Sequence, residues 1–243
     1  MVTALMDDNR TGTTTRQSPV LVVELVGPAC AGKTTLTRAL TQCTTSVQVA
    51  PEISMQRRKH WAAFLRSAPV LLPVMLSGGR KSGRFGWEDV KSMVYVQGWP
   101  GVLKQLAANN PGLVLLDQGP VFRMTLLHAF GPDRIRKPTT DTWWNGLFKQ
   151  WAAFLDLVIW LDAPNTVLVR RINARDRWHL VKGKSEREAA QFLDRYRASY
   201  RYVLTRLSAN GGPRIIPFDT NQVSIDEVAR AILAACELEA DRD

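Results

Sequence analysis

The sequence is poor in cysteine and contains no long hydrophobic run, and each shortage excludes a class of protein. Only three cysteines occur in 243 residues, and they are scattered along the chain. Three are too few for a disulfide framework, and their spacing fits no zinc site. The longest apolar runs, at 68–76 and 155–163, are far shorter than a membrane span. We therefore expect a reduced, cytoplasmic protein with no membrane partner.

The chain is expected to form one domain with a tail at each end. Residues 1–18 lack the continuous apolar core of a secretory signal and are predicted to be disordered. Residues 19–235 contain no repeat and no low-complexity linker, so we expect them to fold as a single unit. A short C-terminal tail over 236–243 follows.

Positive charge predominates, with a formal net charge of +10, and it is concentrated in two blocks. Residues 53–91 carry eight Lys and Arg against two acids, and residues 168–206 carry eleven against four. Such blocks indicate two surfaces that meet phosphate or another anion. Solvated helix faces and a nonspecific nucleic-acid surface are the alternatives.

Short apolar runs alternate with longer helical stretches, which predicts an α/β fold with a parallel sheet and helices on both faces. The run at 19–27 is nearly continuous and β-branched, as in a strand buried on both faces. Its one charge, Glu24, is expected to meet a partner on a neighbouring element. Helix starts are predicted by capping boxes at 185–188 and 224–227. Strands are expected at 19–27, 46–52, 111–119, 155–164 and 213–219.

Residues 27–34 match the pattern G-x-x-x-x-G-K-[ST] between an expected strand and an expected helix. Its glycines let the backbone curl so that N–H groups point at phosphate oxygens, and the helix adds its positive N-terminal end. Lys33 supplies a mobile cation for the β- and γ-phosphates, and the Thr34 hydroxyl can hold Mg²⁺. The residues predicted to bind the nucleotide here are Gly27, Pro28, Ala29, Cys30, Ala31, Gly32, Lys33, Thr34 and Thr35.

Two acids follow expected strands, on the side where ligands bind in a parallel sheet. Asp117 ends the strand at 111–119, where a carboxylate can bind Mg²⁺ or orient an acceptor hydroxyl. Glu52 follows the strand at 46–52 and is also placed to touch an acceptor. Two carboxylates near a γ-phosphate suit its transfer to a hydroxyl, because one assists deprotonation and the other serves the metal. Asp117 can instead begin a turn before Gly119. The role of Glu52 depends on the strand at 46–52, which has the weakest signal of the five.

Four arginines gather after the strand at 155–164. Arg171 and Arg175 are four residues apart and share a helix face, and Arg170 and Arg177 flank it. Like charges at that spacing disfavour an isolated helix, so a negative partner is indicated. Positioned arginines accelerate phosphoryl transfer by about 10³–10⁵-fold. Surface arginines on a solvated helix are the alternative.

Together these residues resemble the P-loop kinases of the thymidylate kinase and deoxynucleoside kinase type. The resemblance implies a three-layer P-loop NTPase fold with a five-stranded parallel sheet, and ATP and Mg²⁺ as cofactors. It implies a lid segment over about 170–186 that closes over ATP. The matching segments are 27–35, 51–52, 115–119, 156–177 and 215–232, in that order.

The resemblance also assigns roles. It makes Glu52 or Asp117 the acid at the acceptor hydroxyl, places the four arginines on the transferring phosphate or the donor, and puts residues near 219–222 beside the adenine. This chain departs from the pattern at Gln118, where such kinases commonly have an arginine that grips the acceptor. Arg123 or the basic run at 57–59 is the candidate replacement. Otherwise the acceptor is neither a nucleotide nor a nucleoside.

One basic, glycine-rich segment, 77–104, fits no part of this resemblance. Its tryptophans, Trp87 and Trp99, either form an aromatic wall of the acceptor pocket or pack on the core.

The leading hypothesis is an ATP- and Mg²⁺-dependent kinase acting on a small-molecule acceptor, with a nucleoside or nucleotide as the first expectation. The two basic blocks motivate a polynucleotide or RNA end kinase as an alternative. A nucleotide-binding regulatory protein that transfers nothing is the second alternative. The sequence leaves homodimer formation open.

Overall fold

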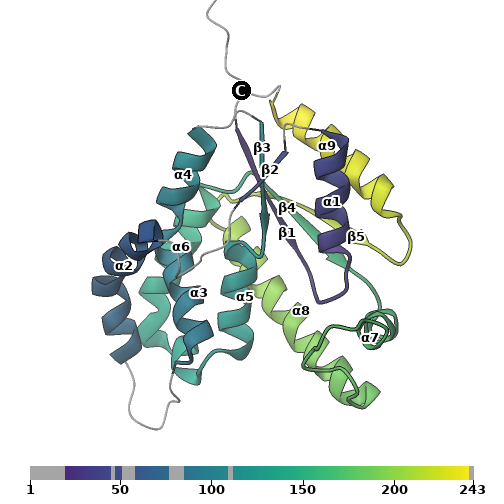
Figure 1. Ribbon diagram of the computed structural model, residues 1–243. Coiled ribbons are helices and arrows are strands. Elements are labelled where there is room, and N and C mark those ends of the chain that lie inside the picture. Colours follow the sequence, from purple (N-terminus) through teal and green to yellow (C-terminus); the bar gives the residue numbers. More distant parts are fainter. Residues whose placement is uncertain (1–19, 45–46, 51–57, 77–84, 109–111, 241–243) are drawn as a thin grey trace, which may run out of the picture.

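A computed structural model describes the chain at residues 20–44, 47–50, 58–76, 85–108 and 112–240 (Figure 1). Glu52 and the first residue of the basic run, Arg57, lie outside these ranges, as do the N-terminal tail predicted over 1–18 and residues 241–243 of the predicted C-terminal tail. Within the described ranges, no helix is both long and apolar enough to cross a membrane.

The centre of the molecule is a five-stranded sheet in the order β2-β3-β1-β4-β5, with every neighbouring pair parallel (Figure 1). All five strands predicted from the apolar runs are confirmed. Because the strands are parallel, their carboxyl ends meet at one edge, where ligands bind in such sheets. The strands are Leu21–Val26 (β1), Val47–Val49 (β2), Leu113–Asp117 (β3), Leu157–Asp162 (β4) and Arg214–Asp219 (β5).

Helices surround the sheet in the three-layer arrangement that the sequence predicts. The capping boxes are confirmed: Ser185 and Glu188 exchange hydrogen bonds before α8, and Ser224 and Glu227 do so before α9. The helices are Lys33–Cys43 (α1), Arg58–Leu76 (α2), Trp87–Gly98 (α3), Pro100–Ala108 (α4), Pro120–Phe130 (α5), Asp141–Ala152 (α6), Asn165–Asn173 (α7), Glu186–Ser208 (α8) and Ile225–Ala240 (α9), with 3₁₀ turns at Asp133–Arg136 (η1) and Pro138–Thr140 (η2).

Each face of the sheet has its own apolar core. α1, α7 and α9 cover one face, and α3, α5, α6 and most of α8 cover the other (Figure 1). Trp99 is fully buried in the second core, so it packs inside the protein instead of lining a pocket. Trp87 is exposed at the start of α3. α9 continues to Ala240, past the boundary expected at residue 235, because Leu, Glu and Ala are strong helix formers.

Glu24, the acid of β1, is completely buried and accepts hydrogen bonds from the N-terminus of α5. Its two carboxylate oxygens accept from the backbone N–H groups of Val121 and Phe122, each at 2.9 Å. Burial raises the pKa of Glu24 to about 8, although these N–H groups lower it. The partner expected for Glu24 is therefore a helix end, and the contact fixes α5 against β1.

Gly119 leaves the space that the Glu24 carboxyl group occupies. A Cβ atom at this position would lie 2.7 Å from the Glu24 carboxyl carbon. We therefore expect Gly119→Ala to lower the free energy of unfolding by about 1–3 kcal/mol. Gly101 in α4 is the matched control, because no atom lies within 4 Å of its added Cβ. Gly101→Ala should leave stability unchanged or raise it by up to about 1 kcal/mol. Urea unfolding measures both, and equal losses would contradict the packing argument.

Candidate functional site

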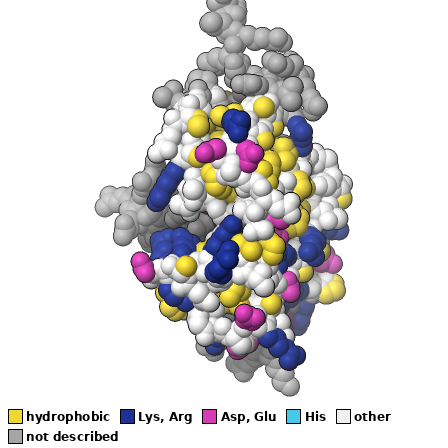
Figure 2. Space-filling view, turned by 90° about the vertical axis from the view of Figure 1, so that its right-hand side faces the viewer, with side chains coloured by type: hydrophobic (Ala, Val, Ile, Leu, Met, Phe, Trp, Pro, Cys, Tyr) yellow, Lys and Arg dark blue, Asp and Glu magenta, His cyan; other side chains and the backbone are white. Residues whose placement is uncertain are grey.

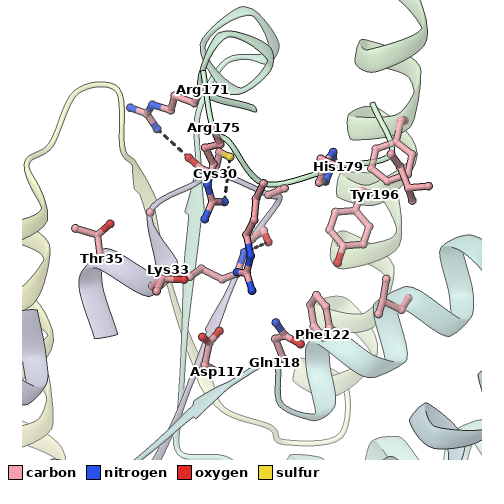
Figure 3. Close-up of a pocket in the computed structure, with 18 of the residues that line it drawn as sticks. Cys30, Lys33, Thr35, Asp117, Gln118, Phe122, Arg171, Arg175, His179 and Tyr196 are labelled. Carbon is pink, nitrogen blue, oxygen red and sulfur yellow. Dashed lines mark hydrogen bonds between the residues drawn. The ribbon is translucent and has the colours of Figure 1, made fainter. Parts of the chain in front are cut away.

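A cavity of about 660 Å³ opens at the carboxyl edge of the sheet, between the loop after β1, the end of β3, α5, the segment after α7 and α8 (Figure 3). Most of the site residues predicted from the sequence meet here. Those that line the cavity are Gly27, Ala29, Cys30, Gly32, Lys33, Thr34, Thr35, Asp117, Arg171, Arg175 and Arg177. Of the other predicted residues, Pro28, Ala31 and Arg170 are not among its lining residues, and Glu52 lies outside the described residues.

The loop after β1 has the curled backbone that the glycine pattern predicts. Gly27 has a φ of 140°, and a Cβ atom there would lie 2.0 Å from the carbonyl oxygen of Leu161. Only glycine fits this close approach. Cys30 also has a positive φ, 62°, and α1 begins directly after Gly32. The loop therefore directs backbone N–H groups and the positive end of α1 into the cavity, as an anion site requires.

Lys33 turns back onto its own loop. Its ammonium donates to the carbonyl oxygens of Gly27 at 2.6 Å and Pro28 at 2.9 Å. Burial lowers the pKa of Lys33 to about 8, and the nearby charge of Asp117 opposes this change. The hydroxyl of Tyr200 donates to the same Gly27 oxygen at 3.2 Å, so α8 helps to hold the loop. The Lys33 ammonium is thus held by loop carbonyl oxygens, which it can exchange for the oxygens of an incoming phosphate.

The lowered pKa of Lys33 predicts a pH dependence. The ammonium is protonated below about pH 8 and loses its proton as the pH rises through that value. We expect affinity for a fluorescent ATP analogue to fall by up to about tenfold per pH unit above 8, because the neutral amine attracts phosphate weakly. The Lys33→Arg variant should show a flat profile over the same range, since arginine stays charged. A wild-type profile as flat as that of the variant would contradict the assignment.

Asp117 and Thr34 can hold a magnesium ion in this cavity. Both line it, and each offers an oxygen donor, Thr34 from the first turn of α1 and Asp117 from the end of β3. Mg²⁺ is usually bound through one or two protein oxygens together with phosphate oxygens and water, so two donors are enough. No cluster of three or more His, Cys, Asp or Glu that could hold a metal occurs in the described ranges. The donor set therefore fits a nucleotide-bound Mg²⁺ better than a metal held by protein alone.

Arg171 lies at one end of the cavity, where it joins two loops. Its guanidinium donates to the side chain and the backbone oxygen of Thr220, both at 2.9 Å. It also reaches the backbone oxygen of Cys30 at 3.4 Å. Arg171 and Arg175 do not share a helix face as predicted, because α7 ends at Asn173. Arg175, beyond that end, lies 3.4 Å from the Cys30 sulfur, and Figure 3 shows both arginines beside the phosphate loop. The predicted arginine cluster thus splits, because Arg170 is exposed outside the cavity.

Arg170 and Arg171 are neighbours in α7, and they provide a matched test of the end of the cavity that Arg171 lines. Arg171→Ala removes a cation that lines the cavity and bridges the loop after β1 to the loop after β5. We expect nucleotide affinity to fall by about tenfold or more, since hydrogen bonds to charged groups contribute about 1.5–3 kcal/mol. Arg170→Ala should change affinity less than about twofold. Titration of a fluorescent ATP analogue measures both, and similar losses would show that charge alone matters, not position.

The candidate replacement for an arginine at position 118 does not line the cavity. Gln118 lines the cavity and has a left-handed backbone with φ 59°. Arg123 is not among the lining residues; its guanidinium carbon lies 5.8 Å from the Tyr95 ring and 5.5 Å from the Phe122 ring. Asp162, at the end of β4, pairs with Arg197 at 2.7 Å and accepts from the N–H of Ala163.

Sequence reasoning missed the aromatic and apolar part of the lining. Apolar side chains recur every three or four residues along α8, as on a core-facing helix; among them Tyr196 is buried and also lines the cavity. His179 lies there too; its Nδ1 accepts from the N–H of Val181 at 3.3 Å, and burial lowers its pKa. A periodicity cannot separate a core face from a pocket wall. The missed lining residues are Phe122, Leu126, Phe130, His179, Leu180, Phe192 and Tyr196.

No family model and no curated protein matches the sequence. Several solved structures match the fold. Thymidylate kinase from Candida albicans aligns with a TM-score of 0.55 and 14% identity over 93% of this chain and 94% of that one. Deoxyadenosine kinase from M. mycoides with bound dATP gives 0.50 and 13%, over 88% and 100%. YorR from Bacillus subtilis, in complex with phosphorylated GDP, gives 0.50 and 17%, over 90% and 96%.

The chain therefore has the fold of P-loop nucleoside and nucleotide kinases, as the sequence resemblance predicts. At this level of identity the likeness establishes the architecture. What the protein does has to be argued from its own site.

Proposed function

We propose that this protein is an ATP- and Mg²⁺-dependent kinase that transfers the γ-phosphate to a small-molecule acceptor carrying a hydroxyl or phosphate group. One observation carries the proposal: the phosphate loop, Asp117 and Arg175 line a single cavity that continues beyond them into a second, apolar end. A protein that only binds or hydrolyses a nucleotide has no need for that second end. The kinase fold of the structural neighbours is consistent with it.

In this proposal the donor nucleotide occupies the phosphate loop, with its base toward Arg171 and Thr220. Loop N–H groups and Lys33 hold the β- and γ-phosphates, and Lys33 exchanges its bonds to loop carbonyls for bonds to phosphate oxygens. Arg175 is placed to neutralise charge on the transferring group, because it lies against the loop at Cys30. Thr34 and Asp117 would hold Mg²⁺, which neutralises charge on the phosphate oxygens when it is bound.

Asp117 is the proposed acid at the acceptor. It ends β3 next to Lys33, and its carboxylate can orient the attacking hydroxyl or accept its proton. Glu52 remains the second candidate from the sequence. If Glu52 serves the acceptor hydroxyl instead, Asp117 keeps its role at the metal alone.

An acceptor screen tests the proposal. ADP release by the purified chain with ATP and Mg²⁺ is followed across nucleosides, nucleoside monophosphates, sugars and simple alcohols. We expect at least one class to raise ADP release well above the rate with water alone. Turnover that requires oligonucleotides and falls steeply with salt would favour an RNA end kinase instead. Tight ATP binding with no acceptor-stimulated turnover would contradict the proposal and favour a regulatory protein.

A further inference from the structure

The end of the cavity farthest from Arg171 is apolar. Figure 3 shows Phe122 and Tyr196 on the opposite side of the site from Arg171 and Thr35. The rings of Phe130 and Phe192 stack with their centres 4.8 Å apart, and Tyr196 continues the cluster. Leu126 and Leu180 complete this lining. An acceptor bound here has to place an apolar or aromatic body against these side chains.

Few polar groups face this end in the part of the chain that the structure describes. Gln118 and His179 are the uncharged polar side chains among the described lining residues near it. The Tyr196 hydroxyl is already hydrogen-bonded to Tyr200. A sugar or a nucleobase is normally recognised by several convergent hydrogen-bonding groups. The lining therefore favours an acceptor whose one necessary polar group is the hydroxyl that receives the phosphate.

The apolar lining continues out to the protein surface. Phe130 and Leu180 line the cavity and are nevertheless 37% and 59% exposed. Trp178, two residues before Leu180 in the segment after α7, is 79% exposed. We call these three side chains the apolar rim.

A cation contacts the apolar rim. The Arg195 guanidinium carbon lies 5.4 Å from the Phe130 ring. Figure 2 shows basic, acidic and hydrophobic side chains interspersed on the lower half of its face. Exposed tryptophan and leucine flanked by Lys and Arg are the composition that binds anionic lipid surfaces. Lys182, Lys184 and Arg187 are exposed cations close to Trp178 and Leu180 in the sequence, and they alternate there with the acids Asp176, Glu186 and Glu188.

We propose that the acceptor is an alcohol with an apolar body, taken from an anionic lipid surface on which the apolar rim docks. This rests on the proposed kinase function and departs from the expectation of no membrane partner. In the reaction, the alcohol oxygen forms a bond to the γ-phosphorus, the bond from that phosphorus to the β–γ bridging oxygen breaks, and ADP leaves. The hydroxyl proton passes to Asp117 and then to water.

Vesicle sedimentation of the full chain tests the docking surface. We expect binding to phosphatidylglycerol–phosphatidylcholine vesicles, loss of binding in high salt, and little binding to phosphatidylcholine alone. Trp178→Ser with Leu180→Ser should weaken binding at least tenfold. The control replaces Leu65 and Leu72 of α2, which are 72% and 58% exposed, by serine and should bind as the wild type does. Equal binding to both vesicle types, or a loss only in the α2 control, would overturn the proposal.

Activity in the same vesicles tests the acceptor. Farnesol and dioleoylglycerol dispersed in anionic vesicles are compared with thymidine and thymidine monophosphate in solution, with ADP release and transfer of labelled phosphate as readouts. Phosphorylation of either apolar alcohol at a rate at least tenfold above that of the soluble acceptors supports the proposal. Phosphorylation of thymidine or its monophosphate alone would overturn it while leaving the proposed kinase function intact. No transfer to any acceptor would overturn both.

Discussion

Replacing Lys33 by methionine is expected to lower phosphoryl transfer by about 10²–10³-fold or more while leaving the protein folded. The ammonium is the cation that the phosphate loop itself supplies, and removing one preorganised donor to a developing charge typically costs that much. Methionine matches the length of the lysine stem, so packing in the loop is conserved. Rapid-quench or steady-state transfer assays measure the loss once an acceptor is known, and ADP release measures it before then.

The same substitution should not destabilise the chain in the absence of nucleotide. The pKa of Lys33 is lowered to about 8 in the folded protein, so the charged form is less favourable there than in the unfolded chain. Between about pH 8 and 10.5 the unfolded chain therefore binds more protons than the folded protein. The free energy of unfolding of the wild type should rise over this range relative to that of Lys33→Met. ATP should raise the melting temperature of the wild type only. A Lys33→Met protein with unchanged turnover would contradict the role of Lys33.

Asp117→Asn is the second substitution with a large expected effect. It removes the carboxylate charge at the end of β3 and keeps the shape of the side chain. We expect the turnover number to fall by about 10²–10⁴-fold, because the acid is proposed to orient or deprotonate the acceptor. Nucleotide affinity should fall much less. Kinetics that separate the turnover number from the Michaelis constant for ATP distinguish these effects.

Asp133→Asn provides the control for Asp117→Asn, because Asp133 is an exposed acid in η1, paired with Arg136 and outside the cavity. It should leave both kinetic constants unchanged. If Asp117→Asn weakens only nucleotide binding, Asp117 serves the donor and its metal, and the acceptor hydroxyl must be served by another acid, with Glu52 as the remaining candidate.

The features that sequence predicted well are local. The phosphate loop is a contiguous pattern, and the capping boxes at Ser185 and Ser224 involve residues three apart. The five strands follow from apolar runs whose alternation with helices permits few topologies. Each of these signals lies within about ten residues, so the chain itself carries the information without any knowledge of the packing.

The features that sequence did not predict depend on contacts between distant segments. Arg171 meets Thr220, 49 residues away, and Glu24 meets Val121, 97 residues away. No short sequence pattern around these residues indicates that they are in contact. The apolar end of the cavity is built from α5, α8 and the segment between α7 and α8, whose aromatic residues look like ordinary core positions in one dimension. The acceptor pocket was for this reason the least predictable part of the site.

The most direct test of the account follows the terminal phosphate of ATP. The purified chain is incubated with γ-labelled ATP, Mg²⁺ and the acceptor panel, with and without anionic vesicles, and the label is separated into inorganic phosphate and organic phosphate. The account predicts label on an organic acceptor in a one-to-one ratio with ADP, and its loss in the Lys33→Met variant. Label found only in inorganic phosphate, at a rate that no acceptor changes, would contradict it.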